Sequence, residues 1–232
     1  MEHLEFLKLY SFDKKIRLGS NGDGGYVIGD LEGTYDFYIS AGVGDEESFT
    51  RDFINKYNMN KTNSAAFDGT IRKYPTNFTN KIFFYRRNIN TYSDINNANL
   101  TYFTDKYNDI FLKMDIEGAE FPWLLSLTDE QLNKFKQITM EVHDINDGSQ
   151  KTLDFFKKLS NTHYLIHAHG NNCCKVTNKI PDVIELTYVR KDCFSEEPKL
   201  NNTTLPIKNF DYPHNDKIPD IPLNFYPFMF DT

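Results

Sequence analysis

The stretch DIFLKMDIEGAEFPWLL, residues 109–125, decides the fold class of this chain. It begins as an apolar run, becomes acidic at Asp115 and Glu117, and continues as a helical pattern with Trp123 and Leu124 on one face. This pattern predicts a buried strand that delivers carboxylates to its C-terminal end. Ligands of open α/β sheets bind outside the carboxyl ends of the strands, so Asp115 is a candidate for chemistry. The same acidic residues could instead only cap the helix.

Strand-like and helical segments alternate on both sides of this stretch. The order predicts a doubly wound α/β fold with a mostly parallel sheet whose last pair of strands is antiparallel. Two further short strands, 16–18 and 26–28, flank a tight turn of the sequence NGDGG. The expected strands besides the apolar start of the opening stretch are residues 36–40, 64–67, 81–85, 137–142, 164–169 and 183–189.

The composition of the chain changes after Cys193. Prolines punctuate residues 194–232 and aromatic residues crowd their end, which excludes a regular helix or a central strand. We therefore expect a single domain over residues 1–193. Residues 194–232 form a C-terminal extension that packs on this domain or on a partner subunit, which leaves a homodimer as one arrangement.

Charge and cysteine content exclude several classes of protein. The 232 residues carry a formal charge of −7, whereas a nucleic-acid partner requires a clustered basic face. We see neither an apolar run long enough to span a membrane nor a secretory leader, which predicts a soluble cytoplasmic protein. Three cysteines without CxxC spacing favour reduced thiols over disulfides or structural zinc.

A strand, a glycine turn and a helix follow one another over residues 36–57, the order of a nucleotide-type site. Gly42 and Gly44 begin a G-x-G pattern, but Glu47 stands where the dinucleotide fingerprint has its third glycine. Acidic residues at this helix start, including Asp45, would repel a pyrophosphate. They suit a ligand that carries an ammonium and a sulfonium, such as S-adenosylmethionine.

Two later strand ends offer further contacts to such a cofactor. The Asp68-Gly69 pair lies about 26 residues beyond Gly42, near the spacing at which a carboxylate binds ribose hydroxyls. Asp68 is therefore the expected ribose ligand. Asn88 follows the next strand and could hydrogen-bond the adenine edge or only end the strand.

Methyl transfer to a hydroxyl needs a group that removes the hydroxyl proton. His143 is the expected base, because imidazole titrates near the working pH and the neighbouring Asp144 could hold its tautomer. His169, at the end of another strand, is the second candidate. Either histidine could instead be a structural hydrogen bonder.

A metal site is an alternative use of the same region. Mg²⁺ or Mn²⁺ would bind and acidify a vicinal diol, and carboxylates at neighbouring strand ends are suitable ligands. The Asn171-Asn172 pair could hydrogen-bond sugar hydroxyls or simply form a turn, and Tyr26 could stack on a sugar face. The four candidate metal ligands are Asp115, Glu141, His143 and Asp144.

A series of motifs occurs in order between residues 16 and 192: RLGSNGDGGYVI, SAGVGDEESF, FDG, LKMDIEGAEF, EVHD, HAHGNN and ELTYVRKD. Together they resemble FkbM-like S-adenosylmethionine-dependent methyltransferases. The resemblance implies a Rossmann-like class I methyltransferase fold with a seven-stranded, mostly parallel sheet. It also implies O-methylation of a sugar hydroxyl in a glycan or glycoconjugate.

The resemblance further implies roles for individual residues. Gly42, Gly44 and Asp45 would surround the methionine part of the cofactor, and Asp68 the ribose. A second set would face the transfer site, namely Asp115, Glu117, Glu141, His143, His169, Asn171 and Asn172. The resemblance does not extend beyond Cys193.

Three other classes of protein remain open from the sequence. A nicotinamide-dependent oxidoreductase would share the sheet, although Glu47 in place of the third glycine counts against it. A non-catalytic binding module with the same fold is a second alternative. An N- or protein-methyltransferase is the third.

Overall fold

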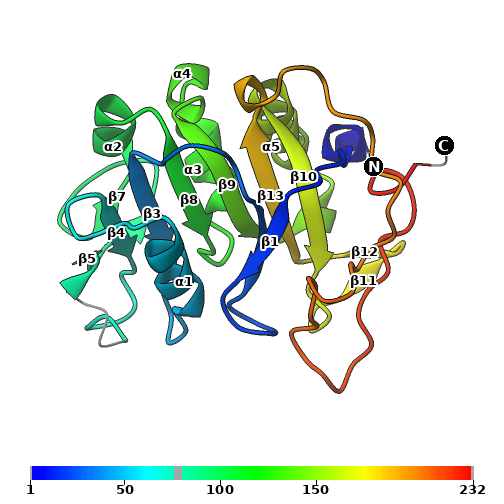
Figure 1. The fold of residues 1–232 in the computed structure, drawn as a ribbon, viewed down its shortest axis with the longest axis horizontal. Helices are drawn as coiled ribbons and strands as arrows, with labels where there is room; N and C mark the ends of the chain where they lie inside the picture. The colour runs from blue at the N-terminus through cyan, green and yellow to red at the C-terminus, as the bar shows by residue number, and fades with distance from the viewer. Residues whose placement is uncertain (1, 76–79, 231–232) are drawn as a thin grey trace.

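The centre of the molecule is a seven-stranded sheet in the order β10-β13-β9-β8-β3-β4-β5 (Figure 1). The computed structural model describes residues 2–75 and 80–230. Only β13 runs against its neighbours β9 and β10, and the remaining pairs are parallel. The mostly parallel α/β sheet predicted from the sequence is thus confirmed. Its strands are β3 (Phe37–Ala41), β4 (Ser64–Phe67), β5 (Phe83–Tyr85), β8 (Ile110–Met114), β9 (Phe135–Val142), β10 (His163–Gly170) and β13 (Ile184–Arg190).

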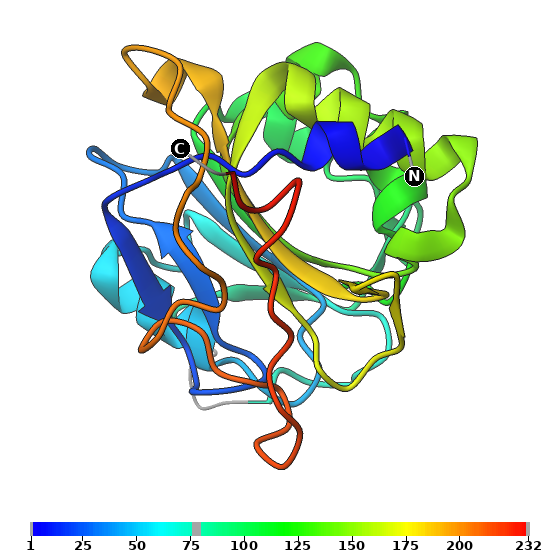
Figure 2. The same cartoon turned by 90° about the vertical axis from the view of Figure 1, so that its right-hand side faces the viewer.

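Different elements cover the two faces of the sheet (Figure 2). One face carries the 3₁₀ helix η1 (Glu2–Leu7) and the helices α2 (Thr101–Lys106), α3 (Glu120–Ser126), α4 (Asp129–Leu132) and α5 (Gln150–Thr162). The other face carries α1 (Ser48–Lys56) and the antiparallel hairpin of β1 (Lys15–Leu18) and β2 (Tyr26–Gly29). The remaining short elements are β6 (Asn88–Ile89), β7 (Asn97–Ala98), η3 (Ile145–Asp147), β11 (Val176–Thr177), β12 (Ile180–Pro181) and η4 (Lys191–Cys193).

Strand β8 is apolar except for Lys113, because both of its faces are buried. Ile110 and Leu112 pack into the larger core beneath the helices, and Phe111 packs into the smaller core beneath α1. Trp123 of α3 is fully buried and its indole N–H donates to the Asn99 carbonyl at 3.0 Å. The helical face predicted after β8 is therefore a packing face.

Helix starts follow the local sequence. Thr128 and Gln131 form a reciprocal capping box at the start of α4, as the TDEQ sequence predicts. Ser149 caps α5 by accepting a hydrogen bond from the Thr152 N–H. Phe155 and Phe156 then lie on the buried side of α5, so this helix is held mainly by its apolar face.

Residues 194–230 contain no helix and no strand, and they run along the outside of the sheet beside β10 (Figure 2). Leu205, Leu223 and Phe228 of this tail are at most 1% exposed and join the larger core. Burying side chains of this size contributes about 1.5–3 kcal/mol each. Within residues 2–75 and 80–230, no helix has both the length and the apolar character needed to cross a membrane.

We propose that the tail packs on its own domain and predict that Phe228→Ala lowers the free energy of unfolding by about 3–5 kcal/mol, because Phe228 is fully buried. The matched control is Tyr226→Ala in the same segment, since Tyr226 is 47% exposed and should matter little. Denaturant unfolding of both variants measures the difference. Equal stabilities would show that the tail is not held by this core.

Candidate active site

The loop after β3 crosses closely over the end of β8. Gly42 has a φ of +79°, and a Cβ at this position would overlap the carbonyl oxygen of Asp115. The Asp115 N–H in turn donates to the Ala41 carbonyl at 2.9 Å. Glycine is required at residue 42 on both counts, the left-handed backbone and the close approach.

Asp68, the expected ribose ligand, holds this glycine loop in place. Its Oδ2 accepts the N–H groups of Val43 and Gly44, both at 3.0 Å. Its Oδ1 accepts the N–H of Thr70 at 2.7 Å and the hydroxyl at 2.6 Å. Burial raises the pKa of Asp68, but these hydrogen bonds outweigh it and leave the pKa below its usual value. The structure therefore uses the carboxylate to shape the loop, with no oxygen left free for a ribose.

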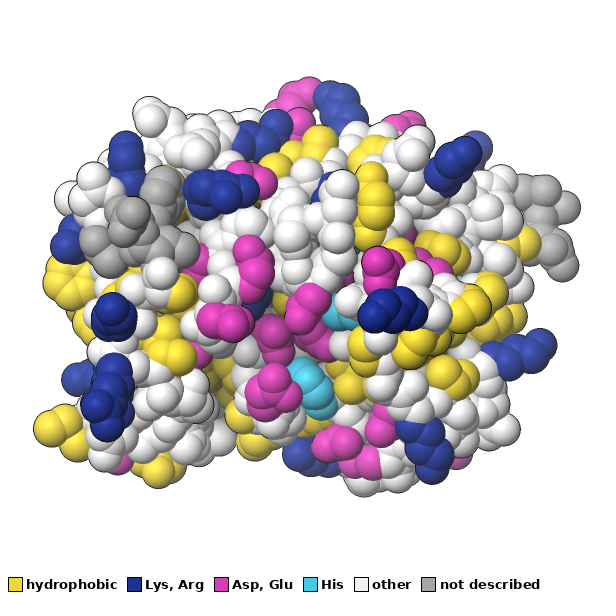
Figure 3. Space-filling view, turned by 90° about the horizontal axis from the view of Figure 1, so that it is seen from below, with side chains coloured by type: hydrophobic (Ala, Val, Ile, Leu, Met, Phe, Trp, Pro, Cys, Tyr) yellow, Lys and Arg dark blue, Asp and Glu magenta, His cyan; other side chains and the backbone are white. Residues whose placement is uncertain are grey.

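A cavity of about 450 Å³ opens at the carboxyl ends of β3, β4 and β8, between the glycine loop and the turn after β8. Wider hollows exist, such as one of about 950 Å³ beside Lys136, but none of the residues expected in the site line it. Asp and Glu side chains gather in the middle of this face of the molecule (Figure 3). Six acidic side chains line the cavity, namely Asp23, Asp45, Glu46, Asp68, Asp115 and Glu117, against the two basic side chains Arg87 and Lys113.

The sequence also predicted Gly69, Asn88 and Asp45 as cofactor-binding residues and singled out Glu47 in place of a third glycine. Gly69 and Asn88 lie together, since a Cβ on Gly69 would collide with the Asn88 side chain, and Asn88 lines the cavity. Asp45 is exposed at its rim. Glu47 is instead buried beneath the loop, where it accepts hydrogen bonds from Ser40 and Tyr74.

Lys113 lies on the floor of the site, although the sequence alone did not single it out. Its ammonium donates to the Gly42 carbonyl at 2.7 Å and lies 5.7 Å from the centre of the Tyr26 ring. Tyr26 is only 1% exposed, with its ring edge-on to Phe49. Tyr26 lines the cavity, but too little of its ring is exposed to support the expected stacking on a sugar.

Asp115 lies at the boundary between this cavity and the end of β9. Burial raises its pKa, and Lys113 and His143 only partly oppose this effect. Its Oδ1 is buried without a hydrogen-bond partner among the described residues. A buried carboxylate oxygen of this kind requires a ligand, an ion or a water molecule.

His143 follows β9 and lies between two carboxylates, one in the turn after β8 and one at the start of α3. Its Nε2 is 3.3 Å from Glu117 Oε2, and its Nδ1 is 3.3 Å from Glu120 Oε1. Glu120 is fully buried and also accepts the N–H groups of Ile116 and Gly118. Burial alone would lower the pKa of His143, but Glu120 and the surrounding carboxylates raise it to about 9.

Asp144 does not orient His143, contrary to the expectation from the sequence. Asp144 has a φ of +56° where the chain turns into η3, and its side chain is exposed. Glu120 takes the role expected of Asp144.

The four expected metal ligands also do not converge: within the described residues, Asp115, Glu117 and His143 bring ligand atoms within 4.8 Å of one another, without Glu141 or Asp144.

An acidic row crosses the sheet from this site toward the tail. In the strand register, His169 on β10 lies opposite Glu185 on β13, and Glu185 lies opposite Glu141 on β9. Asp115 lies next in the row, directly after the Met114–Met140 pair of β8 and β9. Cross-strand neighbours share one face of a sheet, so these four side chains lie side by side. Burial, Asp115 and Glu185 together raise the pKa of Glu141 to about 7.

The polar residues at the far end of this row contact protein groups rather than the cavity. Asn171 donates to Glu141 Oε1 at 2.8 Å and so orients that carboxylate. Asn172 donates to the carbonyls of Asn215 and Ile218 in the tail, which leaves it no free amide hydrogen for a sugar.

His169, the second candidate base, is engaged through both ring nitrogens. Nδ1 lies 3.0 Å from Glu185 and Nε2 lies 3.1 Å from both carboxylate oxygens of Asp220. Burial opposes protonation, but these carboxylates raise the pKa of His169 to about 10. His169 is therefore not free to take a proton from an acceptor.

A sequence profile described as the methyltransferase FkbM domain matches residues 21–172. The chain belongs to the FkbM methyltransferase family. The match spans β2 of the hairpin, the glycine loop, the turn after β8 and the Asn171-Asn172 pair, and the seven-stranded sheet is that of a Rossmann-like methyltransferase. Comparison with curated proteins finds no match.

The cavity of this FkbM domain fits the methyl donor that the family implies. S-adenosylmethionine carries positive charge, and the carboxylates around the cavity outnumber the cations. The unpartnered Asp115 Oδ1 and the exposed Asp45 and Glu46 are the groups that could face such charge. Phe67 and Ile89 offer apolar wall for an adenine ring.

Several important residues of the FkbM domain and its tail escaped the sequence analysis. For Glu120 the sequence left open whether it only caps the helix, although a glutamate on the apolar side of α3 is a sign of a buried partner. Glu185 is a single carboxylate within the apolar strand β13, which is a comparable signal. His214 and Asp220 of the tail gave no signal, because only the fold brings residues 194–230 to this end of the sheet.

Proposed function

We propose that this protein is an S-adenosylmethionine-dependent O-methyltransferase that acts on a sugar hydroxyl of a glycan or glycoconjugate. The observation that carries the proposal is the position of His143, which is held by Glu117 and Glu120 beside Asp115 at the edge of the acidic cavity. S-adenosylmethionine would supply a methyl group on a positively charged sulfur, which an acceptor oxygen displaces in line.

His143 would take the hydroxyl proton of the acceptor. Buried Glu120, whose Oε1 lies 3.3 Å from Nδ1, would orient the ring and stabilise the imidazolium that forms. Nε2 then points toward Glu117, whose side chain is 85% exposed and can move aside for an acceptor. Glu117 itself has a φ of +57°, an uncommon backbone conformation for a side chain of this size, of the kind that clusters at functional sites.

The acidic row supports a polyhydroxyl acceptor. Asp115 and Glu141 offer several acceptor oxygens within reach of the region around His143, and sugar hydroxyls are donors that such oxygens bind. An amine acceptor is disfavoured, because neighbouring carboxylates keep an amine protonated and so block its lone pair. Methyl transfer to proteins or amines, without transfer to glycans, would overturn the sugar assignment.

Cofactor binding depends on the loop that Asp68 holds. We predict that Asp68→Asn weakens calorimetric binding of S-adenosylhomocysteine by about tenfold or more, because an amide cannot accept all five hydrogen bonds that the carboxylate receives. Asp105→Asn, at an exposed position of α2 away from the cavity, serves as the matched control for loss of charge. A protein that binds no S-adenosylhomocysteine at all would contradict catalysis and leave a non-catalytic module.

The pH dependence of the rate tests the base. His143 must be neutral to accept a proton, so with a pKa of about 9 the value of kcat/KM should rise with pH and level off near that pH. Glu120→Gln keeps an oxygen for the two backbone N–H groups but removes the charge, and its rising limb should move to lower pH. Methyl transfer rates across the alkaline range measure both profiles. An unchanged profile in Glu120→Gln would exclude His143 as the titrating group.

A further inference from the structure

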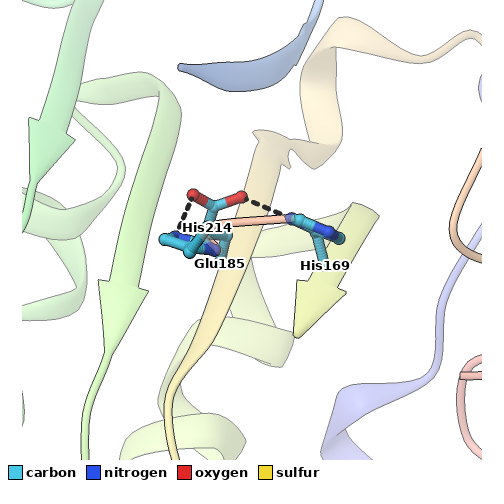
Figure 4. Close-up of side chains that lie close together, drawn as sticks. All are labelled: His169, Glu185 and His214. Carbon is cyan, nitrogen blue, oxygen red and sulfur yellow. Dashed lines mark hydrogen bonds and ion pairs between the residues drawn. The ribbon is translucent and has the colours of Figure 1, made fainter. Parts of the chain in front are cut away.

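Two histidines and a glutamate meet where the tail crosses the sheet (Figure 4). His169 comes from β10, Glu185 from β13 and His214 from the tail. His169 Nδ1 lies 3.0 Å from Glu185 Oε2, and His214 Nε2 lies 3.3 Å from Glu185 Oε1. All three ligand atoms lie within 4.8 Å of one another.

The cluster is buried and its polar atoms are incompletely paired. The side chains of His214 and Glu185 are only 5% and 6% exposed. Within the described residues, Glu185 Oε1 and both ring nitrogens of His214 have no partner in hydrogen-bond geometry, although Nε2 and Oε1 are close. Buried polar atoms are rarely left in this state without an ion or water between them.

The surroundings of His169 match those of a metal-bound histidine. Its Nε2 lies 3.1 Å from both oxygens of Asp220, so this nitrogen can donate its proton to a carboxylate and leave Nδ1 as the free ligand atom. Such a carboxylate behind the ring fixes the tautomer and raises the basicity of a metal-binding histidine. Asp220, like His214, belongs to the tail.

We propose that His169 Nδ1, Glu185 and His214 Nε2 bind a divalent transition metal ion such as Zn²⁺. Nitrogen and carboxylate oxygen are ligands that zinc accepts, with bonds of about 2.0–2.2 Å. Ligand atoms on a tetrahedral ion with such bonds lie about 3.3 Å apart, and here one ligand atom from each of the three residues lies within 4.8 Å of the others. Each histidine nitrogen lies next to a different oxygen of Glu185, His169 Nδ1 3.0 Å from Oε2 and His214 Nε2 3.3 Å from Oε1. Two imidazoles in the set favour such an ion over Mg²⁺.

The metal would fasten the tail to the sheet at the end of the acidic row. Two of its ligands lie on neighbouring strands and the third lies in the tail, so the ion would connect segments that are far apart in the chain. This site shares no residue with the Asp115, Glu117 and His143 group, and the proposal does not depend on the methyl acceptor.

Metal titration of the untagged, chelator-treated full chain tests the proposal. We expect one Zn²⁺ per chain by calorimetry, ligand-field absorption bands of a four- or five-coordinate site with Co²⁺, and no saturable binding of Mg²⁺. Zn²⁺ should also raise the Tm and slow proteolysis of the tail. A wild-type protein that binds neither Zn²⁺ nor Co²⁺ would overturn the proposal and leave a cluster of charged histidines paired with carboxylates.

Variants locate the ion. His214→Gln should lower the affinity for Zn²⁺ by about a hundredfold and abolish the metal-dependent rise in Tm. Glu117→Gln, in the other cluster, is the matched control and should bind Zn²⁺ like the wild type. Equal binding by His214→Gln, or loss of binding only in Glu117→Gln, would place the ion elsewhere and refute the assignment. The Co²⁺ spectrum of the wild type keeps the test valid if His214→Gln does not fold.

Discussion

Replacing His143 with alanine should lower kcat by about two to four orders of magnitude, the usual contribution of a positioned general base. A carboxylate oxygen lies 3.3 Å from each ring nitrogen of His143, and the side chain lies beside Asp115 at the edge of the cavity. Initial rates of methyl transfer from labelled S-adenosylmethionine to purified glycans measure the effect. Wild-type rates in His143→Ala would exclude His143 as the base.

Two controls separate loss of the base from loss of the fold. S-adenosylhomocysteine should bind His143→Ala almost as well as the wild type, since His143 does not line the cavity. Added imidazole should restore part of the activity in a pH-dependent manner, which a purely structural role of His143 would not produce. Failure of both controls, together with a lowered Tm, would make His143 a structural residue.

Gly42→Ala should abolish measurable binding of S-adenosylhomocysteine and lower the Tm. The new Cβ would overlap the Asp115 carbonyl oxygen, which is backbone and cannot move without displacing the end of β8. The left-handed φ of +79° adds about 1–2 kcal/mol of strain for a residue with a side chain. Calorimetric binding and thermal unfolding measure the two effects.

Two other glycines provide controls for Gly42→Ala. Gly44 and Gly148 also have positive φ, but a Cβ on either would have no heavy atom within 4 Å. Gly148→Ala, remote from the cavity, should show only the backbone strain. Gly44→Ala should show the same strain within the cofactor loop, with a smaller loss of binding than Gly42→Ala. Equal behaviour of all three variants would mean that the approach to Asp115 is unimportant.

Local chemistry made much of the fold predictable from the sequence. The apolar run before Asp115 could only be a strand buried on both faces, and β8 is that strand. The TDEQ sequence predicted the start of α4, because a threonine and a glutamine at this spacing satisfy each other's backbone groups. The strand, glycine turn and helix order likewise predicted a glycine loop between β3 and α1, and Gly42 and Gly44 of that loop have positive φ.

The sequence also predicted that several acidic residues and a histidine lie together at strand ends. Asp115, Glu117 and His143 follow predicted strands, and the carboxyl ends of parallel strands meet at one edge of a sheet. Asp68, expected as a ribose ligand, also lies at this cavity, where its carboxylate holds the glycine loop. Residue type and strand position were enough for these inferences, because both are properties of short segments.

Only the tertiary structure decided which atoms contact one another. Glu120 rather than Asp144 lies against His143, because Asp144 turns outward at a left-handed residue while α3 carries Glu120 inward. Asp68 accepts hydrogen bonds from the glycine loop. His169 lies against Asp220, a tail residue that comes 51 positions later in the chain. Hydrogen bonds and ion pairs depend on separations of about 3 Å, and those separations are set by how distant segments pack, which no short segment of the sequence contains.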